Sequence, residues 1–233
     1  MVSAIIVAAG SSRRMGFDKL FAPLAGQPVL WHSIKAFTDC KEVDEILIVT
    51  KEDGMDEVEA LVAAEKLHKV TKVISGGAER HISVWNGLQA VNSRGSAFVA
   101  IHDGARPLTT PKLIKACLDL AELHGAACCA SQIPDTMKRA SVEQMVTESV
   151  ERTGLWAMQT PQIFSSGLIL QAYAALMANH EMVTDEVSAV QKLGKKIALL
   201  KNDDWNFKIT FPHDLELAEH VLKLRAKKQR KKC

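Results

Sequence analysis

The segment Ala4-Ile5-Ile6-Val7, followed at once by Ala8-Ala9-Gly10, sets the pattern that decides the fold. A short apolar run that ends in small residues is typical of a strand buried on both faces. Similar runs recur at residues 46–49, 70–74 and 98–101, and helical apolar spacing occupies residues 29–37, 55–67, 79–91 and 111–124. This alternation predicts right-handed crossovers, a mostly parallel sheet and a ligand crevice beyond the carboxyl ends of the strands.

The second half of the chain departs from the alternation. Residues 128–134 predict another strand, but residues 135–155 are polar, lack a helical stripe and indicate an extended arm. Helical spacing returns at 167–177 and 185–192, a last strand follows at 197–200, and a helix is expected from about 212 to 224. We expect one Rossmann-like α/β domain over residues 1–225, with a twisted sheet flanked by helices, and a basic tail at 226–233.

The composition is that of an ordinary globular protein, with 47% hydrophobic and 24% charged residues among 233. The five cysteines are odd in number and include no CxxC pair, which argues against a disulfide framework and a zinc site. The chain shows neither a leader-peptide pattern nor an apolar run long enough to span a bilayer. We therefore expect a cytoplasmic protein without a membrane partner.

Positive charge is concentrated at the C-terminal end. Residues 223–233 contain seven Lys or Arg and no acid, so the net charge of +2 becomes +2 − 7 = −5 for the rest of the chain. Such a run can bind RNA or anionic lipid, but it is more often a solvated helix end, and no aromatic residues accompany it to stack on bases. We expect no nucleic-acid partner.

The segment after the first strand, residues 8–19, combines small residues, two glycines and three cations. Small residues let backbone N–H groups approach a polyphosphate, and Arg14 and Lys19 would stabilise the charge that develops during phosphoryl transfer. The segment lacks the Gly-Lys-Ser/Thr of a Walker loop and the G-x-G-x-x-G of a dinucleotide fold. The segment predicts a loop that binds the triphosphate of a nucleotide, although a glycine turn with solvated arginines is the alternative.

Two further clusters follow predicted strands. Gly76-Gly77 would let the backbone read a base edge, with Ser83 pointing back into the crevice from the next helix. Asp103 is placed to bind Mg²⁺ or a ribose, while an ion pair with Arg106 is the alternative reading. His102 is expected to be structural rather than catalytic.

Four later motifs suggest a family. They are Asp135-Thr136-Met137-Lys138-Arg139, Glu151-Arg152-Thr153-Gly154-Leu155-Trp156, Gln159-Thr160-Pro161-Gln162 and Thr184-Asp185-Glu186. Together with the loop at residues 8–19, they resemble the 2-C-methyl-D-erythritol 4-phosphate cytidylyltransferases, and the resemblance runs from residue 4 to about 218. It implies a nucleotidyltransferase that uses CTP, a polyol phosphate and Mg²⁺ in isoprenoid synthesis.

The resemblance also assigns roles to residues of this chain. It implies charge stabilisation by Arg14, Lys19 and Lys208. The nucleotide contacts it implies are Ala8, Ala9, Gly10, Gly77, Ala78, Ser83, Asp103 and Gly104. Thr136, Arg152 and Thr160 are expected to bind the acceptor, and Asp103 is the candidate metal ligand. In the family the arm reaches across a homodimer, so Thr136 and Arg152 would serve the partner's site.

Some features depart from the family pattern, and other functions remain open. Asp18-Lys19-Leu20 replaces the usual Pro-Lys-Gln, Ala78 replaces a frequent acid, and Gly104 replaces an alanine. None of these changes removes a required cation, and we expect no fused second catalytic domain. A ribitol-5-phosphate cytidylyltransferase is the nearest alternative. A nucleotide-sensing or RNA-binding protein on a transferase fold is the alternative from another class.

Overall fold

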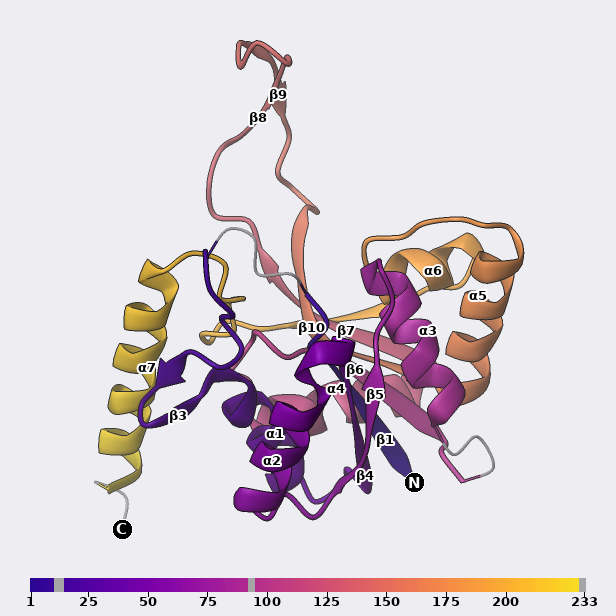
Figure 1. Cartoon of the computed structure of the whole chain (residues 1–233). Coiled ribbons are helices and arrows are strands. Elements are labelled where there is room, and N and C mark those ends of the chain that lie inside the picture. The colour runs from indigo at the N-terminus through magenta and orange to yellow at the C-terminus, as the bar shows by residue number, and fades with distance from the viewer. Residues whose placement is uncertain (11–14, 92–94, 231–233) are drawn as a thin grey trace.

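A seven-stranded sheet with the order β11-β7-β10-β6-β1-β4-β5 forms the centre of the computed structural model, which describes residues 1–10, 15–91 and 95–230 (Figure 1). Its strands are β1 (Val2–Val7), β4 (Glu45–Thr50), β5 (Val70–Ser75), β6 (Phe98–Asp103), β7 (Ala126–Gln132), β10 (Trp156–Ser165) and β11 (Ala198–Lys201). β10 runs antiparallel to β6 and β7, whereas the other neighbouring strands are parallel. The predicted mostly parallel α/β sheet is confirmed.

Helices cover both faces of this sheet because alternate strand residues are apolar on both sides. One core cluster joins Ile6 and Ile48 to the helices α1 (Val29–Asp39), α2 (Met55–Ala64) and α4 (Pro111–His124). The other joins Ile5 and Leu47 to α3 (Arg80–Ala90), α5 (Ser166–Ala178) and α6 (Glu186–Lys192). The molecule is therefore a three-layer sandwich (Figure 1).

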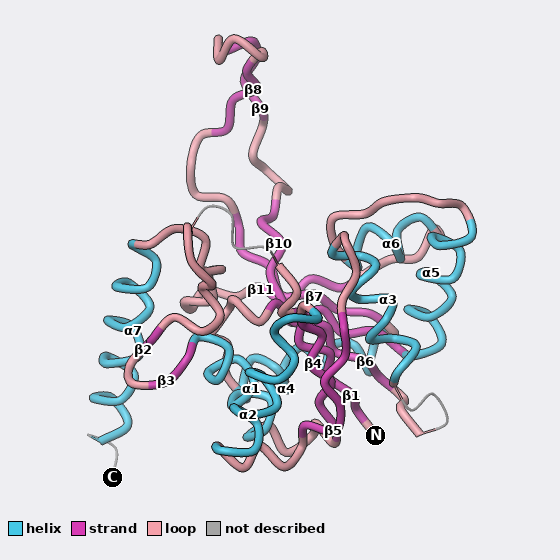
Figure 2. Tube along the Cα trace, in the orientation of Figure 1, coloured by secondary structure: helices cyan, strands magenta, loops and turns pink. Residues whose placement is uncertain are grey.

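Two smaller units stand outside the sandwich. The hairpin of β8 (Met137–Ala140) and β9 (Val146–Val150) extends away from the sheet and forms the arm expected at residues 135–155 (Figure 2). The short pair β2 (Pro23–Leu24) and β3 (Gln27–Pro28) lies beside α7 (His213–Arg230), over a third apolar cluster that includes Leu24, Ile209 and Val221. A single turn of 3₁₀ helix, Glu52–Gly54, precedes α2.

Three details differ from the sequence predictions. β5 is an edge strand with exposed residues, so it is not buried on both faces like β1, β4 and β6. β10 was not predicted at all, since its polar Gln159-Thr160-Pro161-Gln162 stretch does not alternate with apolar residues. α7 ends at Arg230, six residues beyond the end expected at about residue 224.

Candidate active site

A cavity of about 450 Å³ lies at the carboxyl ends of β1 and β6, which pair in register from Val2↔Phe98 to Val7↔Asp103. β4 and β5 lie on one side of β1, and the chain crosses to the other side through α3 to form β6. A change of winding direction of this kind leaves a crevice where ligands bind in open α/β sheets. Nine of the predicted site residues line it: Ala8, Ala9, Gly10, Lys19, Gly77, Ala78, Ser83, Asp103 and Lys208.

Close packing between loops forms one wall of the cavity and explains the paired glycines. A Cβ on Gly76 would lie 2.5 Å from the Ala9 Cβ, and one on Gly77 would lie 2.2 Å from Ile82 Cγ2. Ser83 Oγ accepts a hydrogen bond from the Gly77 amide at 3.0 Å, which fixes the loop over the start of α3. Backbone groups here approach the cavity closely because no side chain stands in the way.

Asp103, which lines the cavity together with the acid Glu79, is surrounded by cations. Its Oδ1 lies 3.1 Å from an Arg80 guanidinium nitrogen, and its Oδ2 lies 3.0 Å from Lys208 Nζ and 3.5 Å from Arg106 Nε. Burial raises the pKa of Asp103, but the three cations outweigh this effect and hold the pKa well below its ordinary value. Asp103 is therefore ionised and binds the cations in place. The ion pair with Arg106 that the sequence offered as an alternative is present.

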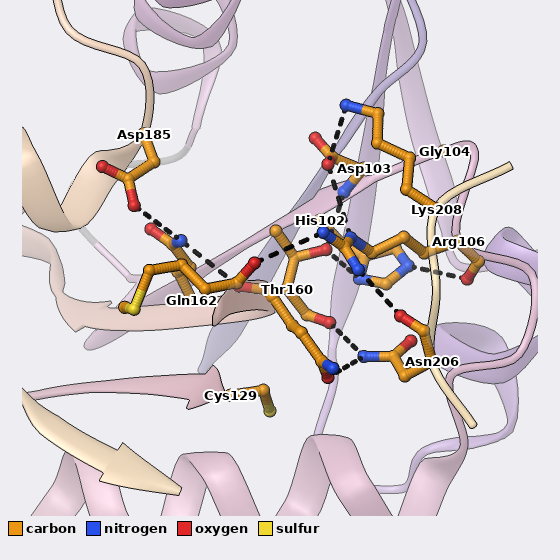
Figure 3. A network of polar contacts seen from close by, with 12 residues as sticks. His102, Asp103, Gly104, Arg106, Cys129, Thr160, Gln162, Asp185, Asn206 and Lys208 are labelled. Carbon is orange, nitrogen blue, oxygen red and sulfur yellow. Dashed lines mark hydrogen bonds and ion pairs between the residues drawn. The ribbon is translucent and has the colours of Figure 1, made fainter. Parts of the chain in front are cut away.

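Behind Asp103 lies a buried polar network built on His102 and Thr160 (Figure 3). Thr160 Oγ1 accepts from the Asp103 amide at 3.1 Å and lies 2.9 Å from His102 Nδ1, while His102 Nε2 lies 3.2 Å from the Arg106 carbonyl oxygen. A carbonyl can only accept, so Nε2 bears the hydrogen, and Nδ1 accepts from the Thr160 hydroxyl. His102 is thus held within a buried network and does not line the cavity.

The C-terminal segment 206–210 closes the other wall. Lys19 Nζ donates to the Ile209 carbonyl at 2.8 Å, and Arg106 donates to the Asn206 carbonyl at 2.8 Å. Lys208, which the sequence separates from Lys19 by almost the whole chain, thereby lines the same cavity. Two cations from opposite ends of the chain, Lys19 and Lys208, and Arg80 of α3 give the cavity a cationic lining suited to phosphate groups.

The comparison with protein-family models identifies the chain. Residues 2–224 match the model described as 2-C-methyl-D-erythritol 4-phosphate cytidylyltransferase. The chain belongs to this family. The cytidylyltransferase family is an enzyme family, so the cavity at Asp103 is a candidate active site, and the resemblance found in the motifs is confirmed.

Relatives and solved structures agree with this assignment. Enzymes described as 2-C-methyl-D-erythritol 4-phosphate cytidylyltransferase from Symbiobacterium thermophilum and Dehalococcoides mccartyi are 40% and 41% identical to the chain, over 97% and 95% of its length and 94% and 96% of theirs. The structure of 4-diphosphocytidyl-2C-methyl-D-erythritol synthase from Anaerococcus prevotii superimposes with a TM-score of 0.83 at 28% identity and covers 96% of both chains. The structure of the Thermus thermophilus cytidylyltransferase superimposes with a TM-score of 0.78 at 29% identity and covers 94% of this chain and 98% of its own.

Not every site residue predicted from the family lines the cavity. Thr160 is buried behind Asp103, and the Gly104 amide donates to the Val7 carbonyl beneath the cavity floor. Thr136 is exposed on the arm, and Arg152 lines a second, open cavity at the base of the arm. Arg14 lies outside the described residues. The single chain therefore brings together most of the residues expected to bind the nucleotide but leaves the two arm residues apart from them.

The donor set gives a poor fit to a Mg²⁺ ion held by the protein. Magnesium prefers oxygen ligands, and its sites in phosphoryl transfer combine one or two carboxylates with substrate phosphates. Both oxygens of Asp103 contact cations, Oδ1 an Arg80 nitrogen and Oδ2 Lys208 Nζ. Asp103 as it stands is therefore a partner for Lys208 and the arginines rather than a metal ligand.

Sequence reasoning missed two residues of this site. Arg80 lines the cavity and contacts Asp103, and Glu186, at the start of α6, contacts Arg80 from behind. Glu186 belongs to the quoted Thr184-Asp185-Glu186 motif and Arg80 lies between the paired glycines and Ser83, but neither residue was assigned a role. Only the packing of α6 against α3 brings them together, a contact that neither local pattern can reveal.

Proposed function

We propose that the protein transfers CMP from CTP to 2-C-methyl-D-erythritol 4-phosphate, giving 4-diphosphocytidyl-2-C-methyl-D-erythritol and pyrophosphate in isoprenoid precursor synthesis. This proposal rests on the cavity at the carboxyl ends of β1 and β6, which Lys19, Lys208 and Asp103 line in a chain that belongs to the cytidylyltransferase family. The phosphate of the acceptor attacks the α-phosphorus of CTP in line, and the bond from that phosphorus to the β,γ-diphosphate breaks.

Catalysis depends on position and charge. The attacking phosphate is already an anion, so the reaction needs no general base. Lys19 and Lys208 stabilise the extra negative charge on the α-phosphate in the transition state, with Arg14 as a third cation expected from the family. Ala8, Gly77 and Ser83 form the wall for the cytosine, and the paired glycines are required there because a Cβ at either position would collide with its neighbours.

Magnesium enters this scheme with the nucleotide. Because the carboxylate of Asp103 is occupied by cations, we assign the ion to the triphosphate and treat Mg·CTP as the substrate.

Among the described residues, no helix is both long and apolar enough to cross a membrane. We assign the enzyme to the cytoplasm, where the buried cysteines Cys40, Cys117, Cys128 and Cys129 stay as free thiols.

The arm completes the site in a homodimer. The hairpin β8–β9 exposes apolar side chains at its tip, including Val142, which is 97% exposed in the single chain. An apolar tip on a hairpin that projects from the fold is suited to packing against a second copy. In that dimer Thr136 and Arg152 bind the acceptor in the partner's cavity.

A pyrophosphate assay tests the reaction. The protein is incubated with magnesium and each of the four nucleoside triphosphates, with methylerythritol phosphate or ribitol phosphate as the acceptor. Pyrophosphate should appear with CTP and methylerythritol phosphate only. Equal turnover with ribitol phosphate would point to the alternative acceptor, and no release with any pair would defeat the enzyme proposal.

Subunit mixing tests the arm. K19A disables the cavity of its own subunit, whereas R152A disables the partner's site, so each homodimer should be inactive. In an equimolar refolded mixture, half of the dimers are heterodimers, and each of these has one of its two sites intact. The mixture should therefore recover about a quarter of the wild-type activity. No recovery above the separate variants would show that Lys19 and Arg152 serve the same subunit's site.

A further inference from the structure

The guanidinium of Arg80 lies between two carboxylates from different parts of the fold. Its Nε and one terminal nitrogen donate to Asp103 Oδ1 at 3.2 and 3.1 Å. Its two terminal nitrogens donate to Glu186 Oε1 at 2.5 Å and Oε2 at 3.2 Å. A planar fork engaged on both sides has little freedom to rotate. Arg80 therefore fixes α3, the end of β6 and the start of α6 relative to one another.

Glu186 is fully buried and does not line the cavity. Besides Arg80, its carboxylate accepts a hydrogen bond from the Tyr173 hydroxyl of α5 at 3.1 Å. A buried charge is tolerated only when it is paired, and a pair of apolar residues would pack here at no such cost. Burial lowers the pKa of Arg80, but Glu186 and Asp103 outweigh this effect and raise it, so the guanidinium stays charged.

The arrangement divides the Asp103 carboxylate between its neighbours. Arg80 takes Oδ1, which leaves Oδ2 directed at Lys208 Nζ, 3.0 Å away (Figure 3). Glu186 also balances charge. Arg80, Arg106 and Lys208 contribute +3 and Asp103 and Glu186 contribute −2, so this cluster of contacting groups carries one net positive charge. Without Glu186, the same groups would sum to +2, and of these two carboxylates only Asp103 would hold Arg80.

We propose that Arg80 and Glu186 are positioning residues for the transfer reaction, which orient Asp103 so that it holds Lys208 at the reacting phosphates. The inference rests on the proposed function, because the orientation matters only if Lys208 acts on a bound nucleotide and acceptor. Glu186 acts through Arg80 and Asp103 and touches no substrate.

The test compares E186Q with a matched control, Y173F. Y173F removes a hydrogen bond to the Glu186 carboxylate and keeps its charge, whereas E186Q removes the charge that faces Arg80. Turnover with CTP and methylerythritol phosphate is measured per folded molecule, below the onset of thermal unfolding. We expect kcat of E186Q to fall about tenfold or more with KM for CTP changed by less than about threefold, and kcat of Y173F to stay within about threefold of the wild type.

A second pair of variants covers poor folding of E186Q. R80M removes the fork and should lose at least as much kcat as E186Q, whereas R80K keeps the charge and should recover part of it. Wild-type kcat in E186Q or R80M, or an equal loss in Y173F and E186Q, would overturn the positioning role. An inactive wild type would overturn the proposed function itself, so the two failures are distinguishable.

Discussion

Buried His102 should make the stability of the fold depend on pH in a way that can be calculated. Its ring is fully buried, donates to the Arg106 carbonyl through Nε2 and accepts from Thr160 through Nδ1. Burial lowers its pKa to about 3 from the ordinary value of 6.5. Protonation would place a charge in the core and abolish the hydrogen bond from Thr160, so the folded protein resists it.

The magnitude follows from the two pKa values. Between pH 6.5 and 3 the unfolded chain binds a proton at this histidine and the folded protein does not, so stability falls as the pH falls. Above pH 6.5 the histidine is neutral in both the folded and the unfolded chain, so this loss of stability is absent. At pH 5.0 the loss is about 1.4 kcal/mol for each of 1.5 pH units, or about 2 kcal/mol.

Urea unfolding of the wild type and H102N, each at pH 7.5 and 5.0, measures this contribution. Asparagine does not titrate, and its amide oxygen can accept from Thr160 as Nδ1 does. The carboxylates titrate alike in both proteins, so their effect cancels in the difference. We expect the wild type to lose about 2 kcal/mol more than H102N between the two pH values. An equal loss in both proteins would refute the assignment of a neutral, buried His102.

Three further predictions concern the cavity. K19A should lower kcat by about a hundredfold or more while the protein stays folded, because it removes a cation from the transition state; near-normal turnover would contradict the role of Lys19. K208A should lower kcat by a similar factor, and a variant that affected only KM for CTP would place Lys208 in ground-state binding instead. G76A should raise KM for CTP strongly, since its Cβ would lie 2.5 Å from Ala9 and 2.8 Å from Ser83 Oγ and would push the two loops apart; unchanged KM would show that the loops can separate freely.

The elements that could be predicted are those whose local pattern matches their burial. β1, β4 and β6 are continuous apolar runs, and α1 and α4 have an apolar stripe that packs on the sheet. β5 has the same β-branched composition, but it lies at the edge of the sheet. This position could not be predicted, because the sequence of one strand does not show whether it has one neighbour or two. β10 escaped prediction because its polar residues Gln159, Thr160 and Gln162 are satisfied by distant side chains and backbone groups.

The candidate site divides in the same way. Residues next to one another in sequence, such as Ala8, Ala9 and Gly10, could be assigned together because the end of one strand presents them to one crevice. Lys208 was assigned only through the family resemblance, since an exposed lysine in a polar segment has no local signature. Arg80 and Glu186 received no role, because their meeting depends on how α6 packs on α3.

By itself the sequence determined the class of fold, the strand ends at which the site had to lie, the family and the cations that suit a triphosphate. The fold class and the strand ends follow from hydrophobic periodicity, which is local, whereas the family follows from the resemblance of the motifs. The tertiary structure decided which charges face one another. Asp103, the candidate metal ligand of the sequence, contacts Arg80, Arg106 and Lys208 because the fold brings their three segments together. Electrostatic interactions depend on distance in space and on burial, and only the folded chain sets either of them.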